Sequence, residues 1–352
     1  MNKTATAVIC GVLAAGLLAG CGKSGKIDST QPAITVDDES ISMGEAVYYL
    51  RAQQAETQTM MEGYGFVDST AFWGQKTTGE NDTEMTYGEQ LKDSVRDELT
   101  EYVLLRRHAA DYDIELPAEV RDAAAEAAKK VYESNTDVLK EIGTTQEEIQ
   151  DAMELYAYPQ LMVDAMTADV DLEVTDEEAA QTRVIYARIR QTEEDESGNQ
   201  VDASEETKET YRGMMEDLLA QIQEAGEVDE DAIREMANAI DEELIMVGST
   251  AYGEGDAYLP EEVTTAAATL KDGETYGEVI ETADGFYYLV NMVAVLDRDA
   301  TDMKKSSIAS QRQQEAFEAV VAEWKEAAEI STGEGWDALT VTDSELWKAA
   351  AS

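Results

Sequence analysis

The chain has little cysteine, histidine and proline, and few basic residues for its length. Among 352 residues it holds 2 cysteines, 1 histidine and 4 prolines. A single histidine, His108, cannot build a multi-histidine metal site, and no Gly-x-Ser-x-Gly motif is present to supply a serine nucleophile. The scarcity of proline, together with 43% hydrophobic residues, argues against a disordered chain. We therefore expect a folded protein without a metal or a cofactor.

The charge of the chain is strongly one-sided. There are 76 acidic residues against 26 basic ones, which gives a formal net charge of -50. Nucleic acid is excluded as a partner because its phosphates would be repelled, and broad contact with anionic lipid head groups is disfavoured. Two interpretations stay open for the acidic surface: it keeps the protein soluble, or it attracts basic clients or divalent cations.

The first residues have the pattern of an export signal. Lys3 is followed by an apolar run from Ala5 to Gly20, which is shorter than the ~18–20 residues that a membrane-spanning helix needs. The run ends in Leu18-Ala19-Gly20-Cys21, which resembles a bacterial lipobox. The resemblance implies that residues 1–20 are removed and that Cys21 carries the lipid. Cys10 would be lost with the signal, so no intramolecular disulfide is expected. The alternative is a plain signal peptide that contains a cysteine.

The first half of the mature chain is predicted to be helical. Residues 21–33 are polar and predict a flexible tether, and residues 34–175 follow as one helical region that opens with a short strand at Ile34–Val36. Apolar spacing predicts a helix from Ser42 to about Met61. Further helices are predicted from Glu89, from Pro117 and from the capping-box segment Thr144–Glu148, the last running through Leu161.

A long loop, Glu62 to Gly88, separates the first two helices. It carries Phe72 and Trp73, and two roles are open for these rings. Long ordered loops are often functional, but large aromatic side chains also fasten a loop onto a core. We favour the second interpretation.

The pattern changes near Val174. Arg183–Arg190 alternates polar and apolar residues, as a half-buried strand does, and helices are predicted at 204–225, 229–240 and 260–270. Strands are expected at 243–247, at 279–280 and at 286–296, with a glycine-rich loop at 248–255. The order indicates an α+β domain over residues 183–298.

A helix returns at Lys304–Ile330, where Phe317, Val320, Val321 and Trp324 form one apolar stripe. The most suitable partner for this stripe is the N-terminal helical half. Residues 304–352 are therefore expected to pack on the N-terminal region, with the α+β domain inserted between them.

Two stretches now resemble a known family. Ile34 to Ala55 resembles the opening of the SurA and PrsA class of extracytoplasmic chaperones: a short strand, a turn and a helix that begins with serine. Val184 to Asp297 resembles a parvulin-type peptidyl-prolyl isomerase domain in its order of elements. The points of match are Tyr186-Ala187-Arg188, Leu259–Val263, Leu270–Glu274 and Asp284–Tyr288. The resemblance implies a SurA-like helical chaperone domain, completed by the C-terminal helix, with an inserted parvulin-like domain.

The sequence departs from active parvulins at the site. Their two usual histidine positions hold Ile189 and Tyr287 here, and no histidine lies in the domain. Prolyl isomerisation needs no proton transfer, only a shaped pocket that stabilises the twisted amide, so activity stays open. The candidate pocket lining is Arg188, Asp241, Tyr252, Leu259, Val263 and Tyr287. The alternative is that the tyrosines are ordinary strand and loop residues.

The favoured function is a foldase or chaperone outside the cytoplasm, anchored to the bacterial cell membrane by lipid on Cys21. Its partners would be unfolded exported polypeptides. A solute-binding lipoprotein is one alternative, and it would require two α/β lobes of repeated strand–helix units. A structural surface lipoprotein without clients is the other.

Overall fold

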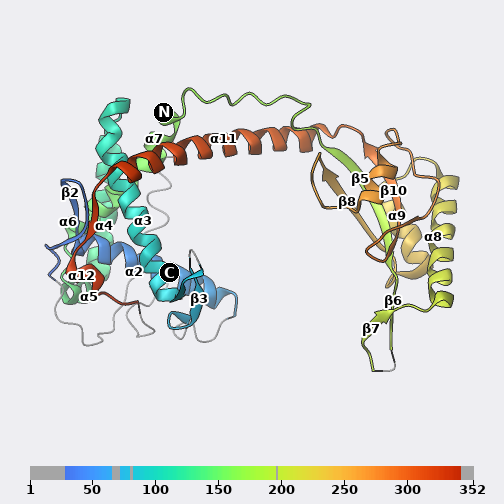
Figure 1. Ribbon diagram of the computed structural model, residues 1–352, viewed down its shortest axis with the longest axis horizontal. Helices are drawn as coiled ribbons and strands as arrows, with labels where there is room; N and C mark the ends of the chain where they lie inside the picture. Colours follow the sequence, from blue (N-terminus) through green and yellow to red (C-terminus); the bar gives the residue numbers. More distant parts are fainter. Residues whose placement is uncertain (1–27, 66–71, 80–81, 196, 342–352) are drawn as a thin grey trace. The chain divides into compact units, whose positions relative to one another are not determined.

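The computed structural model describes residues 28–65, 72–79, 82–195 and 197–341 (Figure 1). The chain divides into two compact units. Unit 1 comprises Met1–Val170 with Gln313–Ser352, and unit 2 comprises Asp171–Arg312. Within the described ranges, no helix is apolar over a length sufficient to cross a membrane. The predicted signal and Cys21 lie outside the described residues.

Unit 1 contains a small antiparallel sheet that pairs strands from early and late in the sequence. Its order is β11-β1-β2, formed by Ile330–Thr332, Pro32–Val36 and Glu39–Ser42. The predicted C-terminal helix was expected to reach Ile330, and this was wrong. The helix α11 (Arg298–Ala327) starts earlier and ends earlier, and the next residues turn into β11. Pairing with β1 satisfies backbone groups of this segment, and the Asp37 N–H donates to the Glu329 carbonyl at 2.8 Å.

Three helices of unit 1 begin at a capping residue. The side chains of Ser42 and Thr145 each accept the backbone N–H of the glutamate three residues later, and the carboxylate of that glutamate accepts the backbone N–H of the capping residue. Thr86 caps α3 in the same way, so that this helix begins at Tyr87, two residues before the predicted start at Glu89. The helices are α2 (Met43–Gly63), α3 (Tyr87–His108), η3 (Ala109–Tyr112), α4 (Ala118–Ser134), α5 (Thr136–Ile142), α6 (Gln146–Leu155) and α7 (Tyr158–Met166).

One predicted helix is two helices. The sequence predicts a single helix from Thr144–Glu148 through Leu161, but the structure ends α6 at Leu155 and begins α7 at Tyr158. Pro159 lies in the first turn of α7. Because proline has no N–H and crowds the preceding turn, it is accommodated at a helix start and not inside a continuous helix.

The core of unit 1 confirms the aromatic anchor. Trp73 is 2% exposed, and its ring lies 5.3 Å from that of Phe72. It precedes a hairpin of β3 (Lys76–Thr78) and β4 (Glu84–Thr86). Phe317 and Val321 of α11 are buried in the same core, so the predicted apolar stripe does pack against N-terminal residues.

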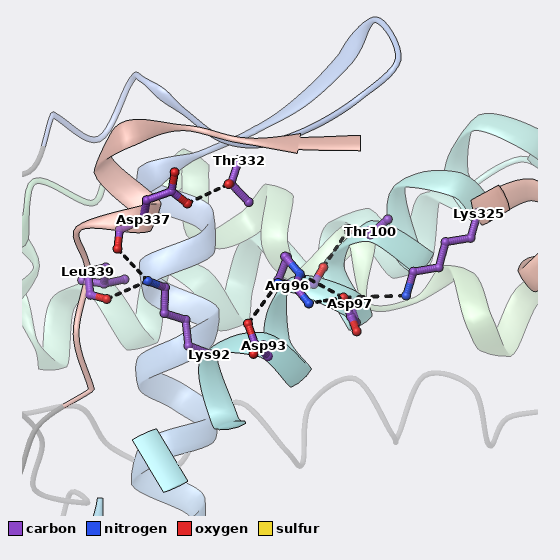
Figure 2. Close-up of polar contacts among 9 residues, drawn as sticks. All are labelled: Lys92, Asp93, Arg96, Asp97, Thr100, Lys325, Thr332, Asp337 and Leu339. Atoms are coloured by element: carbon purple, nitrogen blue, oxygen red, sulfur yellow. Dashed lines mark hydrogen bonds and ion pairs between the residues drawn. The ribbon is translucent and has the colours of Figure 1, made fainter. Parts of the chain in front are cut away.

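The segment after β11 is held to α3 by a lysine (Figure 2). The Lys92 ammonium donates to the carbonyl of Asp337 at 3.0 Å and to that of Leu339 at 2.9 Å. It also lies 5.8 Å from the centre of the Trp336 ring, in a short helix α12 (Glu334–Asp337). One side chain therefore provides hydrogen bonds to two backbone carbonyls of the segment that packs on the core.

Replacing Lys92 should loosen this closure. We expect Lys92→Met to lower the free energy of unfolding by about 1–3 kcal/mol, because two carbonyls lose a charged donor. Urea denaturation followed by tryptophan fluorescence measures this. The control is Lys129→Met, since Lys129 makes an exposed pair with Glu133 and its replacement should change stability by less than about 0.5 kcal/mol. Equal effects of the two changes would contradict the assignment.

Unit 2 is a four-stranded antiparallel sheet with helices on both faces. Its order is β8-β5-β10-β9. The helices α8 and α9 cover one face and α10 covers the other. The elements are β5 (Thr182–Arg190), β6 (Thr192–Glu194), β7 (Gln200–Asp202), α8 (Glu205–Ala225), α9 (Glu230–Asp241), β8 (Met246–Tyr252), α10 (Glu261–Ala267), β9 (Ile280–Glu281) and β10 (Phe286–Ala294). This confirms the predicted order of the three helices and of β5, β8, β9 and β10, whereas β6 and β7 were not predicted as strands.

The glycine-rich loop is the exception. Residues 248–252 were predicted as loop but form most of β8, in unbroken register with β5. Gly248 lies in the extended strand, and the absence of a side chain at this position has a steric reason. A Cβ at this position would lie 2.7 Å from the Tyr186 hydroxyl, so the glycine leaves room for a ring from the neighbouring strand.

The segment before β5 is tied to the first half of α11 by ion pairs. Asp176 accepts from both Arg298 and Lys305. These two cations lower the pKa of Asp176 from 3.8 to about 2. Because the folded-state pKa is depressed, the pairs stabilise unit 2 above pH ~4 and lose that effect as the pH falls towards 2.

Removing this carboxylate should change the acid response of the protein. We expect Asp176→Asn to lower the melting temperature at neutral pH, and the difference from the natural chain to shrink between pH ~4 and ~2. Thermal melts across that range measure it. The exposed neighbour Glu177 provides the control, Glu177→Gln. A difference from the natural chain that stays constant down to pH ~2 would show that the ion pairs do not act in this way.

Candidate functional site

The pairing of β5 with β10 sorts the candidate residues onto two faces. Arg188 lies opposite Tyr288, and Ile189 lies opposite Tyr287. Since successive side chains point to opposite faces of a sheet, each pair belongs to a different face. Ile189 and Tyr287 are buried among residues of α8 and α9, whereas Tyr288 is buried on the α10 side.

Four of the six predicted lining residues lie on or against the α10 face. Leu259 and Val263 are buried there in one apolar cluster with Ile280, which we name the apolar floor of this face. Tyr252, at the end of β8, packs against the same floor, and burial raises the pKa of its hydroxyl. Arg188 completes the group from β5 through its contact with Tyr288.

The other two predicted residues are not brought to this group. Tyr287 is buried against α8, with the Arg212 guanidinium 5.9 Å from its ring centre. Asp241 ends α9, where its carboxylate accepts the N–H groups of Glu243 at 3.0 Å and Leu244 at 2.9 Å. Its hydrogen bonds therefore form the turn that follows the helix.

On the α10 face, Arg188 lies among three aromatic rings. We name the four residues the arginine–aromatic cluster: Arg188, Tyr186, Phe286 and Tyr288. Its guanidinium carbon is 5.1 Å from the ring centre of Phe286 and 5.8 Å from that of Tyr186. Tyr288 lies 5.9 Å from each of these two rings. These are distances at which cation–π and aromatic pairs attract.

The arginine in this cluster has an unused donor. Nη1 of Arg188 donates to the Tyr288 hydroxyl at 3.2 Å, but its Nε–H is buried without a partner among the described residues. The bond to Tyr288 is the main cause of a raised Arg188 pKa, so the guanidinium stays charged. A buried N–H without a partner is costly, and a carbonyl or carboxylate that reached it would remove that cost.

The chemistry available here is binding. Aromatic rings beside a fixed cation suit an apolar side chain together with a peptide carbonyl. Within the described part of the chain, no group of histidine, cysteine and acidic residues is arranged to hold a metal ion.

Sequence reasoning missed Tyr186, Phe286 and Tyr288. The signal was available, because a period of two along each strand places Tyr186 with Arg188, and Phe286 with Tyr288. What the sequence did not show was the register between the two strands, on which the choice between Tyr287 and Tyr288 depends.

Comparison with known proteins gives likenesses of structure. No family model matches the chain, and neither does any curated protein. Among solved structures, the foldase PrsA of Streptococcus pneumoniae is 19% identical and matches over 74% of this chain and 97% of that one, with a TM-score of 0.28. PrsA of Bacillus cereus is 15% identical, with coverages of 75% and 96% and a TM-score of 0.31. A SurA-like chaperone of Campylobacter jejuni is 10% identical, with coverages of 74% and 100% and a TM-score of 0.23.

The predicted resemblance to the PrsA and SurA class is thus confirmed as a structural likeness. The likeness is one of fold.

Proposed function

We propose that this protein is a chaperone that binds unfolded exported polypeptides outside the cytoplasm. The observation that carries the proposal is the arginine–aromatic cluster with its unused, buried N–H. A non-native chain offers both groups that this site lacks: apolar side chains for the rings and backbone carbonyls for the guanidinium. Such recognition is independent of client sequence, as a general chaperone requires.

Exposed apolar side chains border the cluster. Met246 is 58% exposed and pairs with Arg188 across the strands, and Tyr258 is 70% exposed immediately before Leu259 of the floor. Large apolar side chains in water favour burial against a partner. They extend the contact surface for a client beyond the cluster itself.

The proposal includes a lipid anchor on Cys21 and a helical chaperone domain that the C-terminal residues complete. The anchor would hold the protein where clients emerge unfolded, which raises the effective concentration of binding sites near them. The net charge of -50 would favour clients with basic segments and oppose association between copies.

Peptidyl-prolyl isomerisation is a second candidate, favoured by the position of the unused donor. The barrier of ~18–20 kcal/mol comes from amide resonance. A proline ring on the apolar floor, with its amide held by Arg188, could be stabilised in the twisted state without proton transfer. This activity would use the same cluster as client binding.

Replacing Arg188 should separate these functions from the fold. We expect Arg188→Met to weaken suppression of aggregation of a denatured secreted protein by about threefold to tenfold, because the charged donor is lost. Isomerisation of a proline peptide should fall to background in the same variant. Light scattering and a coupled protease assay measure the two effects.

The matched control is Arg212→Met, since Arg212 lies over Tyr287 on the opposite face. It should behave as the natural chain does in both assays. If the natural chain neither suppresses aggregation nor accelerates isomerisation, the proposed function is wrong, and a structural lipoprotein becomes the better interpretation.

The anchor has its own test. We expect Cys21→Ser to move the protein from the membrane fraction to the soluble extracytoplasmic fraction, because the acceptor of the lipid is absent. Cell fractionation and labelling with a radioactive fatty acid measure this. Cys10→Ser is the control and should remain membrane-bound. Labelling of Cys21→Ser equal to that of the natural chain would refute lipidation at this residue.

A further inference from the structure

The strand β8 is an outer strand without the usual protection. It lies at the end of the order β8-β5-β10-β9, and its sequence, MVGSTAY, has neither a charged residue nor a proline. Its pairing with β5 runs without a bulge from Met246 to Tyr252. Outer strands are normally blunted by charges, prolines or bulges because their free backbone groups pair with other chains.

The hydrogen-bond pattern identifies which backbone groups of β8 are free. The backbone groups of Val290 and Met292 hydrogen-bond to the segment 273–276, on the side of β10 that faces away from β5. The odd-numbered residues of β10, such as Leu289, therefore direct their backbone groups towards β5. Because bonding alternates along antiparallel strands, β5 reaches β8 through even-numbered residues, and Val247, Ser249 and Ala251 face outward.

One contact supports this assignment. The Val247 carbonyl accepts from Nη1 of Arg234 at 3.2 Å, so it does point away from β5. The Ala251 carbonyl is contacted by the Thr250 hydroxyl at 3.3 Å. Ser249 lies between them at the centre of the edge, and its outward N–H and C=O have no partner among the described hydrogen bonds.

The free edge is continuous with the arginine–aromatic cluster. Tyr186 lies across Gly248, and a Cβ there would meet its ring, so an aromatic surface extends over β8 towards the edge. Met246 adds an exposed apolar side chain on the same face. A strand added beside β8 would place alternate side chains next to this surface.

Charge selects among occupants of the edge. Exposed carboxylates lie at both ends of β8, from Glu242 and Glu243 before it and from Glu254 after it. A second copy of this chain, with a net charge of -50, would bring the same charges to both ends. A segment carrying lysine or arginine at its ends is complementary.

We propose that the β8 edge binds an extended client segment as an added strand, hydrogen-bonded to Ser249. Apolar side chains of that segment would face the arginine–aromatic cluster, and basic ones would meet the terminal carboxylates. This deepens the proposed chaperone function and rests on it. The mode of recognition is backbone addition to a sheet edge, with pockets for alternate side chains.

The test removes one outward N–H without touching the ladder to β5. Ser249→Pro deletes that donor at an edge position where proline is tolerated, and Ser249→Ala keeps it. The probe is a fluorescein-labelled peptide with lysines at both ends and alternating valine and serine between them. We expect Ser249→Pro to bind it about tenfold more weakly and Ser249→Ala to bind it within about twofold of the natural chain. A peptide with glutamates in place of the lysines should bind more weakly.

A second measurement covers misfolding of the proline variant. In an added strand, every second N–H of the peptide points towards β8. Peptides that are N-methylated at these amides should lose binding to the natural chain, and peptides that are N-methylated at the remaining amides should keep it. Equal binding by all methylated peptides, or by Ser249→Pro and the natural chain, overturns edge pairing. If the natural chain still suppresses aggregation in that case, the chaperone function stands without it. A natural chain that is dimeric by light scattering, with a monomeric Ser249→Pro, would instead assign the edge to a second copy.

Discussion

The antiparallel pairing of β5 with β10 is the constraint on which unit 2 depends. It sets Arg188 against Tyr288 and Ile189 against Tyr287, and so decides which residues form the core under α8 and α9 and which face α10. A shift of one residue would exchange the two sets, burying the guanidinium among aliphatic side chains. The same register determines which residues of β5 hydrogen-bond to β10 and which to β8. It therefore also determines which backbone groups of β8 remain free.

Unit 1 depends on its C-terminal segment in a comparable way. The strand β11 covers one side of β1, and two cations on neighbouring helices hold the carbonyls that follow. Lys92 binds those of Asp337 and Leu339, and Arg51 binds that of Thr340 at 3.2 Å. Arg51 is 5% exposed, and burial lowers its pKa to about 10. A buried cation needs a hydrogen-bond acceptor, and Arg51 finds one in a carbonyl far along the chain. The stability of the N-terminal helices therefore depends on the C-terminal segment.

These features suit the proposed role. A cluster that offers rings and an unused donor would recognise what all unfolded chains share, and an open strand edge would do the same through the backbone. Neither requires the histidines that the sequence lacks. The acidic surface discourages pairing between copies at that edge while leaving it attractive to basic segments.

Local patterns determined most of the elements. Capping residues Ser42 and Thr145 marked helix starts, and the alternation in Arg183–Arg190 marked β5, because caps and periodicity act within a few residues. The prediction of a loop at residues 248–252 was wrong, because glycine usually indicates a turn. Here Gly248 leaves room for the ring of Tyr186, a contact that the sequence does not show. The chain by itself determined the class of fold, the candidate export signal and four of the residues at the α10 face. Only tertiary structure chose Tyr288 over Tyr287 and left the β8 edge open. Register and edge position arise from contacts between residues far apart in the chain, and no local periodicity records them.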